Sequence, residues 1–166
     1  MKKLIISLAL IFVGLSAYSQ SSNYQTYTLF VYSFTRFVQW PPEESTGDFE
    51  IVVLGDSPIV NELKLMAEKK KSRWGTTINV TKITSMAEYK KSHILYIVDA
   101  NRFSEASNKV AEASVLIVTD QAAAANKGCI NFFSKEGRLA FEINKEQMTK
   151  HKLRAASELT RLAIIN

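Results

Sequence analysis

Two patterns of apolar residues alternate along most of the chain. Segments 51–54, 94–98 and 115–118 are continuous apolar runs, which are typical of strands covered on both faces. Between them lie segments such as 58–70 and 102–111, which we interpret as helices. Repeated strand–helix–strand units imply parallel strands joined by right-handed crossovers. The chain is therefore expected to fold as an α/β protein.

The composition of the strands also predicts their order. Segments 77–82 and 138–143 alternate apolar and polar residues, as edge strands do, and 138–143 forms a hairpin with 129–133. We therefore place the second strand outside the first and the later strands on the other side, with a switch point between the first and third strands. The prediction is a doubly wound, mainly parallel sheet with a C-terminal antiparallel hairpin and flanking helices. The expected strands are 49–54, 77–82, 94–98, 115–118, 129–133 and 138–143. The expected helical pieces include 29–39, 58–70, 85–90, 102–111 and 153–164, and a short Ala-rich piece follows the fourth strand at 121–125.

The segment 29–42 concentrates aromatic residues in one amphipathic run. Phe30, Phe34 and Phe37 follow helical spacing, so they share one face, which we expect to pack in the core. A double proline ends the run and pushes Trp40 out of helical geometry. The side chains expected at the surface or its rim are Tyr32, Arg36 and Trp40.

The first residues have the pattern of a secretory signal peptide. Lys2 and Lys3 precede an apolar run at 4–15, and residues 17–19 begin and end with small side chains, which suits cleavage directly after them. We expect residues 1–19 to be removed on export, with an uncleaved membrane anchor as the alternative, and 20–166 to form a single domain. Without the two lysines, 19 basic residues face 16 acidic ones, so the net charge is +3 rather than +5.

The basic residues bear on the class of partner, and the single cysteine bears on disulfide formation. The run 69–73 (KKKSR) is interpreted as a solvated helix end, where lysines complement the helix dipole. The sequence therefore predicts no nucleic-acid partner, which would need Lys and Arg clustered on one face. Cys129 is the only cysteine, so an internal disulfide is impossible, and its apolar strand segment favours burial.

Three of the expected central strands end in an aspartate: Asp56, Asp99 and Asp120. Parallel strands bring these carboxylates to one edge of the sheet, where open α/β sheets bind ligands. With Ser57, they are candidates for an acidic crevice that holds a cation, an amine or another small ligand. The alternative, which we favour, is helix capping, since Asp, Ser and Asn accept from free N–H groups at helix starts.

No segment carries a recognised catalytic or metal-binding motif. The chain lacks G-x-S-x-G, a P-loop, G-x-G-x-x-G and H-E-x-x-H. His93 begins a buried strand, His151 is expected at a charged surface, and neither has a second His or Cys at metal spacing. A hydrolase triad stays open as a minor alternative, because its members can meet from any sequence order. We expect a protein with no catalytic residues, no metal and no cofactor.

Short motifs along nearly the whole mature chain are similar to those of the YfiR family. They are 37–41 (FVQWP), 53–58 (VLGDSP), 93–97 (HILYI), 116–120 (LIVTD), 128–132 (GCINF), 138–144 (RLAFEIN) and 153–159 (LRAASEL). Two positions depart from the family pattern: Gln39 replaces the usual Glu, and Cys129 stands where Gly or Met is common.

The resemblance implies a non-enzymatic periplasmic regulator. Members of the family restrain an inner-membrane diguanylate cyclase, commonly as dimers, and so control cyclic di-GMP and biofilm formation. Since the family is broad, a sensor kinase or a transporter is an alternative partner. Binding energy at interfaces usually rests on a few aromatic and arginine side chains, so Arg36, Phe37 and Trp40 are the candidate partner-binding residues. The alternative function is small-ligand binding in the crevice at the strand ends.

Overall fold

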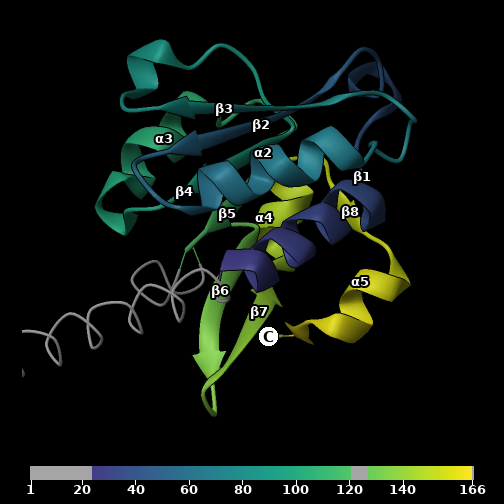
Figure 1. Ribbon diagram of the computed structural model, residues 1–166, viewed down its shortest axis with the longest axis vertical. Helices are drawn as coiled ribbons and strands as arrows, with labels where there is room; N and C mark the ends of the chain where they lie inside the picture. The colour runs from purple at the N-terminus through teal and green to yellow at the C-terminus, as the bar shows by residue number, and fades with distance from the viewer. Residues whose placement is uncertain (1–23, 121–126, 166) are drawn as a thin grey trace, which may run out of the picture.

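The structure, a computed structural model, describes residues 24–120 and 127–165. Its centre is a seven-stranded sheet with the order β3-β2-β4-β5-β6-β7-β9 (Figure 1). The neighbours from β3 to β6 are parallel, and β6 and β7 form an antiparallel hairpin. A separate pair, β1 and β8, is also antiparallel. The strands are β1 (Val38–Gln39), β2 (Phe49–Leu54), β3 (Ile78–Ile83), β4 (Ile94–Ile97), β5 (Leu116–Thr119), β6 (Ile130–Lys135), β7 (Arg138–Ile143), β8 (Arg154–Ala155) and β9 (Ile164–Ile165).

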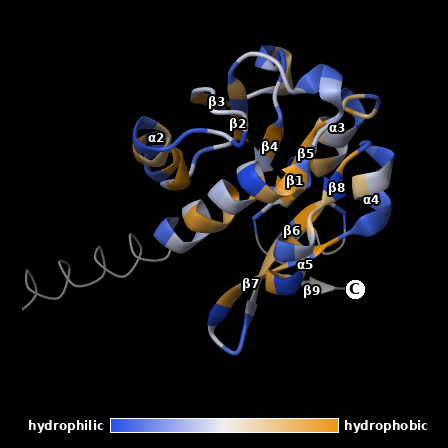
Figure 2. Ribbon diagram, turned by 90° about the vertical axis from the view of Figure 1, so that its right-hand side faces the viewer, coloured by the Kyte–Doolittle hydropathy of each residue, from blue (hydrophilic) through white to orange (hydrophobic). Residues whose placement is uncertain are grey.

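Helices cover both faces of this sheet. The N-terminal helix, residues 24–37, lies beside α2 on one face, while α3 and α4 lie on the other (Figure 2). The N-terminal helix buries Tyr27, Val31 and Phe34, one residue per turn, as an amphipathic helix on a sheet does. The remaining helices are η1 (Pro42–Glu44), α2 (Ile59–Lys69), η2 (Met86–Glu88), η3 (Ala100–Arg102), α3 (Phe103–Lys109), α4 (Lys145–Lys150) and α5 (Ser157–Leu162).

The predicted sheet is confirmed in its order and its strand directions. β3 lies outside β2, and β4, β5 and the hairpin follow on the other side, so the switch point falls between β2 and β4. The continuous apolar runs are the central strands, and every residue of β4 and β5 is buried. The hairpin turns through Glu136 (φ 51°) and Gly137 (φ 74°). Two successive left-handed residues match the right-handed twist of the flanking strands.

The predictions for the two ends of the described chain need correction. The aromatic helix is already formed at residue 24, where the described chain starts and five positions before the expected start, and it ends at 37, because Val38 and Gln39 form a strand. The expected helix 153–164 is instead the sequence β8, α5, β9. The strand β9 pairs with β7, so β7 is not an edge strand there. The Ala-rich piece 121–125 lies outside the described residues.

Aromatic rings from the N-terminal helix and the hairpin form one part of the core. Phe34 is fully buried, with its ring centroid 5.2 Å from that of Phe141 and 5.8 Å from that of Phe132. Phe30 is partly buried and meets Phe141 at 5.1 Å. Burying a phenylalanine contributes about 1.5–3 kcal/mol. The prediction that the phenylalanine face of this helix is core is therefore confirmed.

The side chains of Cys129 and His151 are also buried. Cys129 is fully buried, as expected, and burial raises the pKa of its thiol to about 12. His151 was expected at the surface, but it is 1% exposed because its Nδ1 donates to Ala113 O (2.8 Å) across the fold. Within 24–120 and 127–165, no helix has the length and apolar character that a membrane crossing requires.

Candidate functional site

The FVQWP motif lies in a short antiparallel ribbon that joins the two ends of the fold. Val38 pairs with Ala155 and Gln39 with Arg154, and Ala156 N donates to Phe37 O (2.8 Å). The motifs 37–41 and 153–159 are thus paired through their backbones, although more than a hundred residues separate them in the sequence. This pairing stops the N-terminal helix at residue 37 and aims the following tryptophan inward.

Trp40 belongs to the core, so its predicted position at the rim is wrong. Its side chain is 7% exposed and packs against Phe49 (centroids 5.2 Å apart), Trp74 (6.1 Å) and His93 (6.1 Å). These rings contact Trp40 edge to face, an arrangement that adds to the energy of burial. The Trp40 Nε1–H has no hydrogen-bond acceptor in the part of the chain that the structure describes.

His93 is the polar member of this ring cluster and is held on both nitrogens. Its Nδ1 accepts from Glu50 N (2.9 Å), and its Nε2 donates to Glu44 O (2.9 Å). The imidazole is therefore neutral, with its proton on Nε2, and it stacks on Phe49 at 4.6 Å. Burial lowers the pKa of His93, and the hydrogen bond to Glu44 opposes this shift in part. The histidine joins η1 to β2, a role that its position at a strand start does not reveal.

Arg36 and Phe37 lie beside this cluster at different depths. Arg36 is exposed, and its Nη1 donates to Ser72 O (3.3 Å). Phe37 is half-buried and packs on the core. Arg73, which the sequence placed only within a basic run, donates to Val38 O (3.0 Å) and so braces the ribbon. A hollow of about 570 Å³ opens next to the ribbon and is lined by Gln39, Trp40, Pro42, Ser45, Arg73 and Trp74.

The candidate crevice residues at the strand ends have separate local roles. Asp99 Oδ1 accepts from Asn101 N (2.9 Å) at the start of η3, as the capping prediction required. Asp56 does not cap: it is exposed and pairs with Lys82 (2.8 Å), while Ser57 Oγ accepts from the first N–H of α2 (3.3 Å). A ligand role for these side chains stays a prediction.

Asp120 differs from the other two aspartates because it is largely buried. It follows β5 and lies near Tyr96, which is fully buried, and Tyr27 of the N-terminal helix. Burial raises the pKa of Asp120, and the two tyrosine hydroxyls oppose this rise only in part. Asp120 Oδ1 and Tyr96 Oη have no partner of good hydrogen-bond geometry within 24–120 and 127–165.

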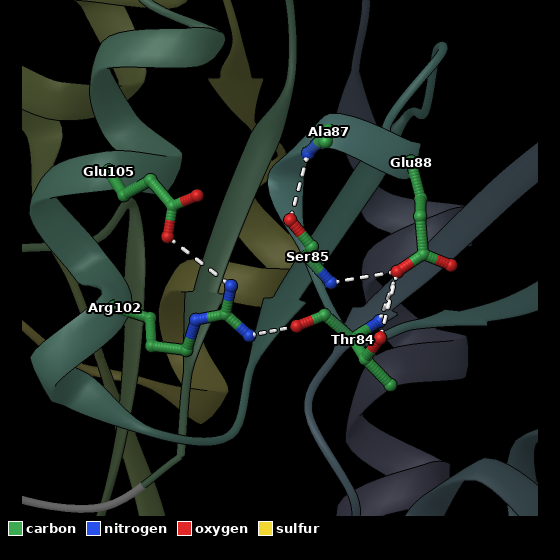
Figure 3. Close-up of polar contacts among 6 residues, drawn as sticks. All are labelled: Thr84, Ser85, Ala87, Glu88, Arg102 and Glu105. Atoms are coloured by element: carbon green, nitrogen blue, oxygen red, sulfur yellow. Dashed lines mark hydrogen bonds and ion pairs between the residues drawn. The ribbon is translucent and has the colours of Figure 1, made fainter.

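The protein's own polar contacts bridge the edge of the sheet at the switch point. Arg102 follows β4 and donates to Thr84 O, which follows β3, so this contact crosses the end of β2 (Figure 3). Arg102 also pairs with Glu105 (3.2 Å). Glu88 Oε1 accepts from Ser85 N (2.9 Å) and Thr84 Oγ1 (2.9 Å), and these hydrogen bonds lower the pKa of Glu88. At this edge of the sheet, where doubly wound sheets commonly hold a ligand, Arg102 and Glu88 are engaged by groups of the protein itself.

The described residues offer no arrangement for metal chemistry. Across residues 24–120 and 127–165, no three side chains of His, Cys, Asp or Glu gather at metal-ligand spacing. Both histidines direct a ring nitrogen at a backbone carbonyl, and neither hydrogen-bonds to a serine in this part of the chain. The distinctive feature around the FVQWP motif is a buried ring cluster beneath exposed basic side chains, which include Arg36 and Arg73.

Comparison with known proteins agrees with the motifs. No curated protein matches the chain. The model of one protein family, described as YfiR/HmsC-like, matches residues 24–164, which includes the ribbon, the ring cluster and all strands of the sheet but the last residue of β9. Because this match covers most of the chain, the protein belongs to the YfiR/HmsC-like family.

Proposed function

We propose that this protein is a non-enzymatic periplasmic regulator that binds and restrains a membrane-bound signalling protein. The family regulates diguanylate cyclase signalling, so the proposed partner is a diguanylate cyclase and the proposed output is the level of cyclic di-GMP. Residues 1–19 would direct export and be removed, and residues 20–166 would act as a homodimer. A sensor kinase is the alternative partner.

The observation that carries this proposal is the family match over residues 24–164. Members of this family are periplasmic and regulatory rather than catalytic. The site supports a binding role because the ribbon and ring cluster hold the segment 36–41 in one conformation. A surface that is ordered before binding loses less entropy when a partner docks.

The partner-binding residues are proposed to act in two ways. Arg36 is exposed and would contact the partner directly, as arginines at interfaces often do. Phe37 is half-buried and Trp40 is buried, so they would support the backbone that carries Arg36, and Trp40 would also line the hollow beside the ribbon. Of the three predicted partner-binding residues, only Arg36 is therefore proposed to contact the partner directly.

Capture of the partner from detergent-solubilised membranes tests this proposal. The tagged wild-type protein should retain a membrane signalling protein, which mass spectrometry identifies. Arg36→Ala should weaken capture, whereas Arg138→Ala, which removes an equally exposed arginine from β7, should not. Equal capture by both variants would remove Arg36 from the site, and retention of no membrane protein by the wild type would contradict the proposed function. Light scattering of the purified protein checks the dimer.

A further inference from the structure

Basic side chains from three distant segments meet at one end of the molecule. The C-terminal ends of the N-terminal helix and of α2 lie side by side next to β1 and β8 (Figure 1). Arg36 reaches the backbone of Ser72, Arg73 reaches that of Val38, and Arg154 pairs in register with Gln39. We name this surface the basic face, and its exposed residues are Arg36, Lys69, Lys70, Lys71, Arg73 and Arg154.

The positive charges of the basic face are not neutralised within the described chain. The ion pairs among residues 24–120 and 127–165 lie elsewhere, and they are Lys82–Asp56, Lys91–Glu44 and Arg102–Glu105. The cations of the basic face instead contact neutral groups. Lys70 Nζ lies 5.8 Å from the centre of the Tyr32 ring, and Lys71 Nζ donates to Thr77 Oγ1 (3.3 Å). The charge therefore remains available to an anionic partner.

The details of these contacts favour a diffuse anionic surface over a single acidic peptide. Arg36 and Arg73 each direct Nη1 at a backbone carbonyl, which holds these two cations at the surface and leaves only the Nε and Nη2 edge of each guanidinium for an anion. The lysines of 69–71 are flexible point charges, which suit a layer of many negative groups. Clusters of four to eight Lys and Arg residues beside a transmembrane helix or on an amphipathic helix are typical of binding to anionic lipids, and six basic residues gather here around the ends of two amphipathic helices.

Two exposed leucines extend the basic face. Leu29 is 67% exposed and lies two turns before Arg36 on the same side of the N-terminal helix. Leu65 is 50% exposed and lies one turn before Lys69 on α2. Apolar side chains next to a basic surface strengthen its attachment to a membrane by entering the interface.

We propose that the basic face docks the protein on the anionic phospholipid headgroups of a membrane, so that it approaches a membrane-bound partner in a fixed orientation. This inference concerns lipid binding by the protein alone, so it is tested without any partner. Its failure would leave the proposed regulatory function standing, and failure of the partner capture would leave the lipid inference standing.

Co-sedimentation with lipid vesicles tests the proposal. The protein is purified after export. Its intact mass is measured to identify the N-terminal residue, so that all variants are compared in the same processed form. The vesicles contain phosphatidylglycerol and phosphatidylethanolamine in equal parts, with pure phosphatidylcholine as the neutral counterpart. The test variant is Lys69→Gln/Lys70→Gln/Lys71→Gln. The matched control, Lys90→Gln/Lys109→Gln/Lys135→Gln, removes the same charge from exposed positions elsewhere.

The wild type and the control should bind the anionic vesicles, and the neutral vesicles should retain little protein. The test variant should lose on the order of a hundredfold in affinity, because each lysine near an anionic surface contributes about a fivefold factor. High salt should release the wild type. Arg154→Gln should weaken binding too, which shows that the ribbon is part of the face.

Equal loss by the test and control variants would overturn the proposal, since net charge alone would then explain binding. Wild-type binding to polyglutamate without binding to anionic vesicles would also overturn it and would assign the basic face to an acidic protein. Thermal melts of each variant ensure that any loss reflects lost charge, since all substituted side chains are exposed.

Discussion

His93 is buried and Asp120 is partly buried, and their environments shift their pKa values in opposite directions. Burial favours the neutral form of each side chain, so the pKa of His93 falls and that of Asp120 rises. His93 is part of the ring cluster under the ribbon, and Asp120 contacts the N-terminal helix through Tyr27. The stability of the fold should therefore depend on pH through two identifiable residues.

His93 should make the fold sensitive to mild acid. Its folded pKa lies below the usual value of 6.5, so the stabilisation by the neutral ring is fully present above that value and is lost as pH falls through the folded pKa. Protonation would place a hydrogen on Nδ1. This hydrogen would face the Glu50 N–H, so the hydrogen bond that Glu50 N donates to Nδ1 would be lost. Urea denaturation across the acidic range should show this loss for the wild type and a flatter profile for His93→Gln. Parallel profiles for the two proteins would contradict the role of His93.

Asp120→Asn should stabilise the protein at neutral pH. The folded pKa of Asp120 is raised, so its contribution to stability is present below the unfolded value of 3.8 and is lost as pH rises through the folded pKa. Asparagine keeps the shape and removes the buried charge. The melting temperature of the variant should exceed that of the wild type at neutral pH and approach it in acid. A lower melting temperature at neutral pH would instead show that the charge is held by a favourable contact.

At the scale of elements, the ribbon of β1 and β8 determines where the aromatic segment ends. The spacing of Phe30, Phe34 and Phe37 correctly predicts a helix with a buried face. The burial of Trp40 could not be predicted, because it depends on pairing with Arg154 and Ala155, far away in the sequence. Two-residue strands are also too short for any periodicity to show. The same limit explains why β9 was missed and α5 was predicted too long.

Trp40→Ala should destabilise the fold rather than act on a partner alone. The substitution removes a ring that contacts Phe49, Trp74 and His93, and such large-to-small changes cost about 3–5 kcal/mol. Chemical denaturation measures the free energy of unfolding. Leu29→Ala is the matched control, because its side chain is exposed and its removal should change stability by about 0.5 kcal/mol or less. Similar stability of Trp40→Ala and the wild type would contradict the buried position.

At the scale of the whole molecule, the sheet follows from the sequence and the site largely does not. Continuous apolar runs identify β2, β4 and β5 as central strands, and alternation identifies β3 as the edge. The candidate aspartates were correctly assigned to strand ends, but Asp56, Asp99 and Asp120 have three different environments. The basic face joins residues 36, 69–73 and 154, so only the folded chain reveals it.

If the protein restrains a membrane-bound cyclase, it should lower cyclase activity when it is added to isolated membranes. Inner membranes permeabilised so that both faces are accessible are titrated with the purified protein, and cyclic di-GMP synthesis from GTP is measured. Synthesis should fall in a saturable manner with the wild type and with Arg138→Ala, and Arg36→Ala should require a higher concentration for the same effect. Synthesis that stays constant at every concentration of the folded wild-type protein would contradict the account.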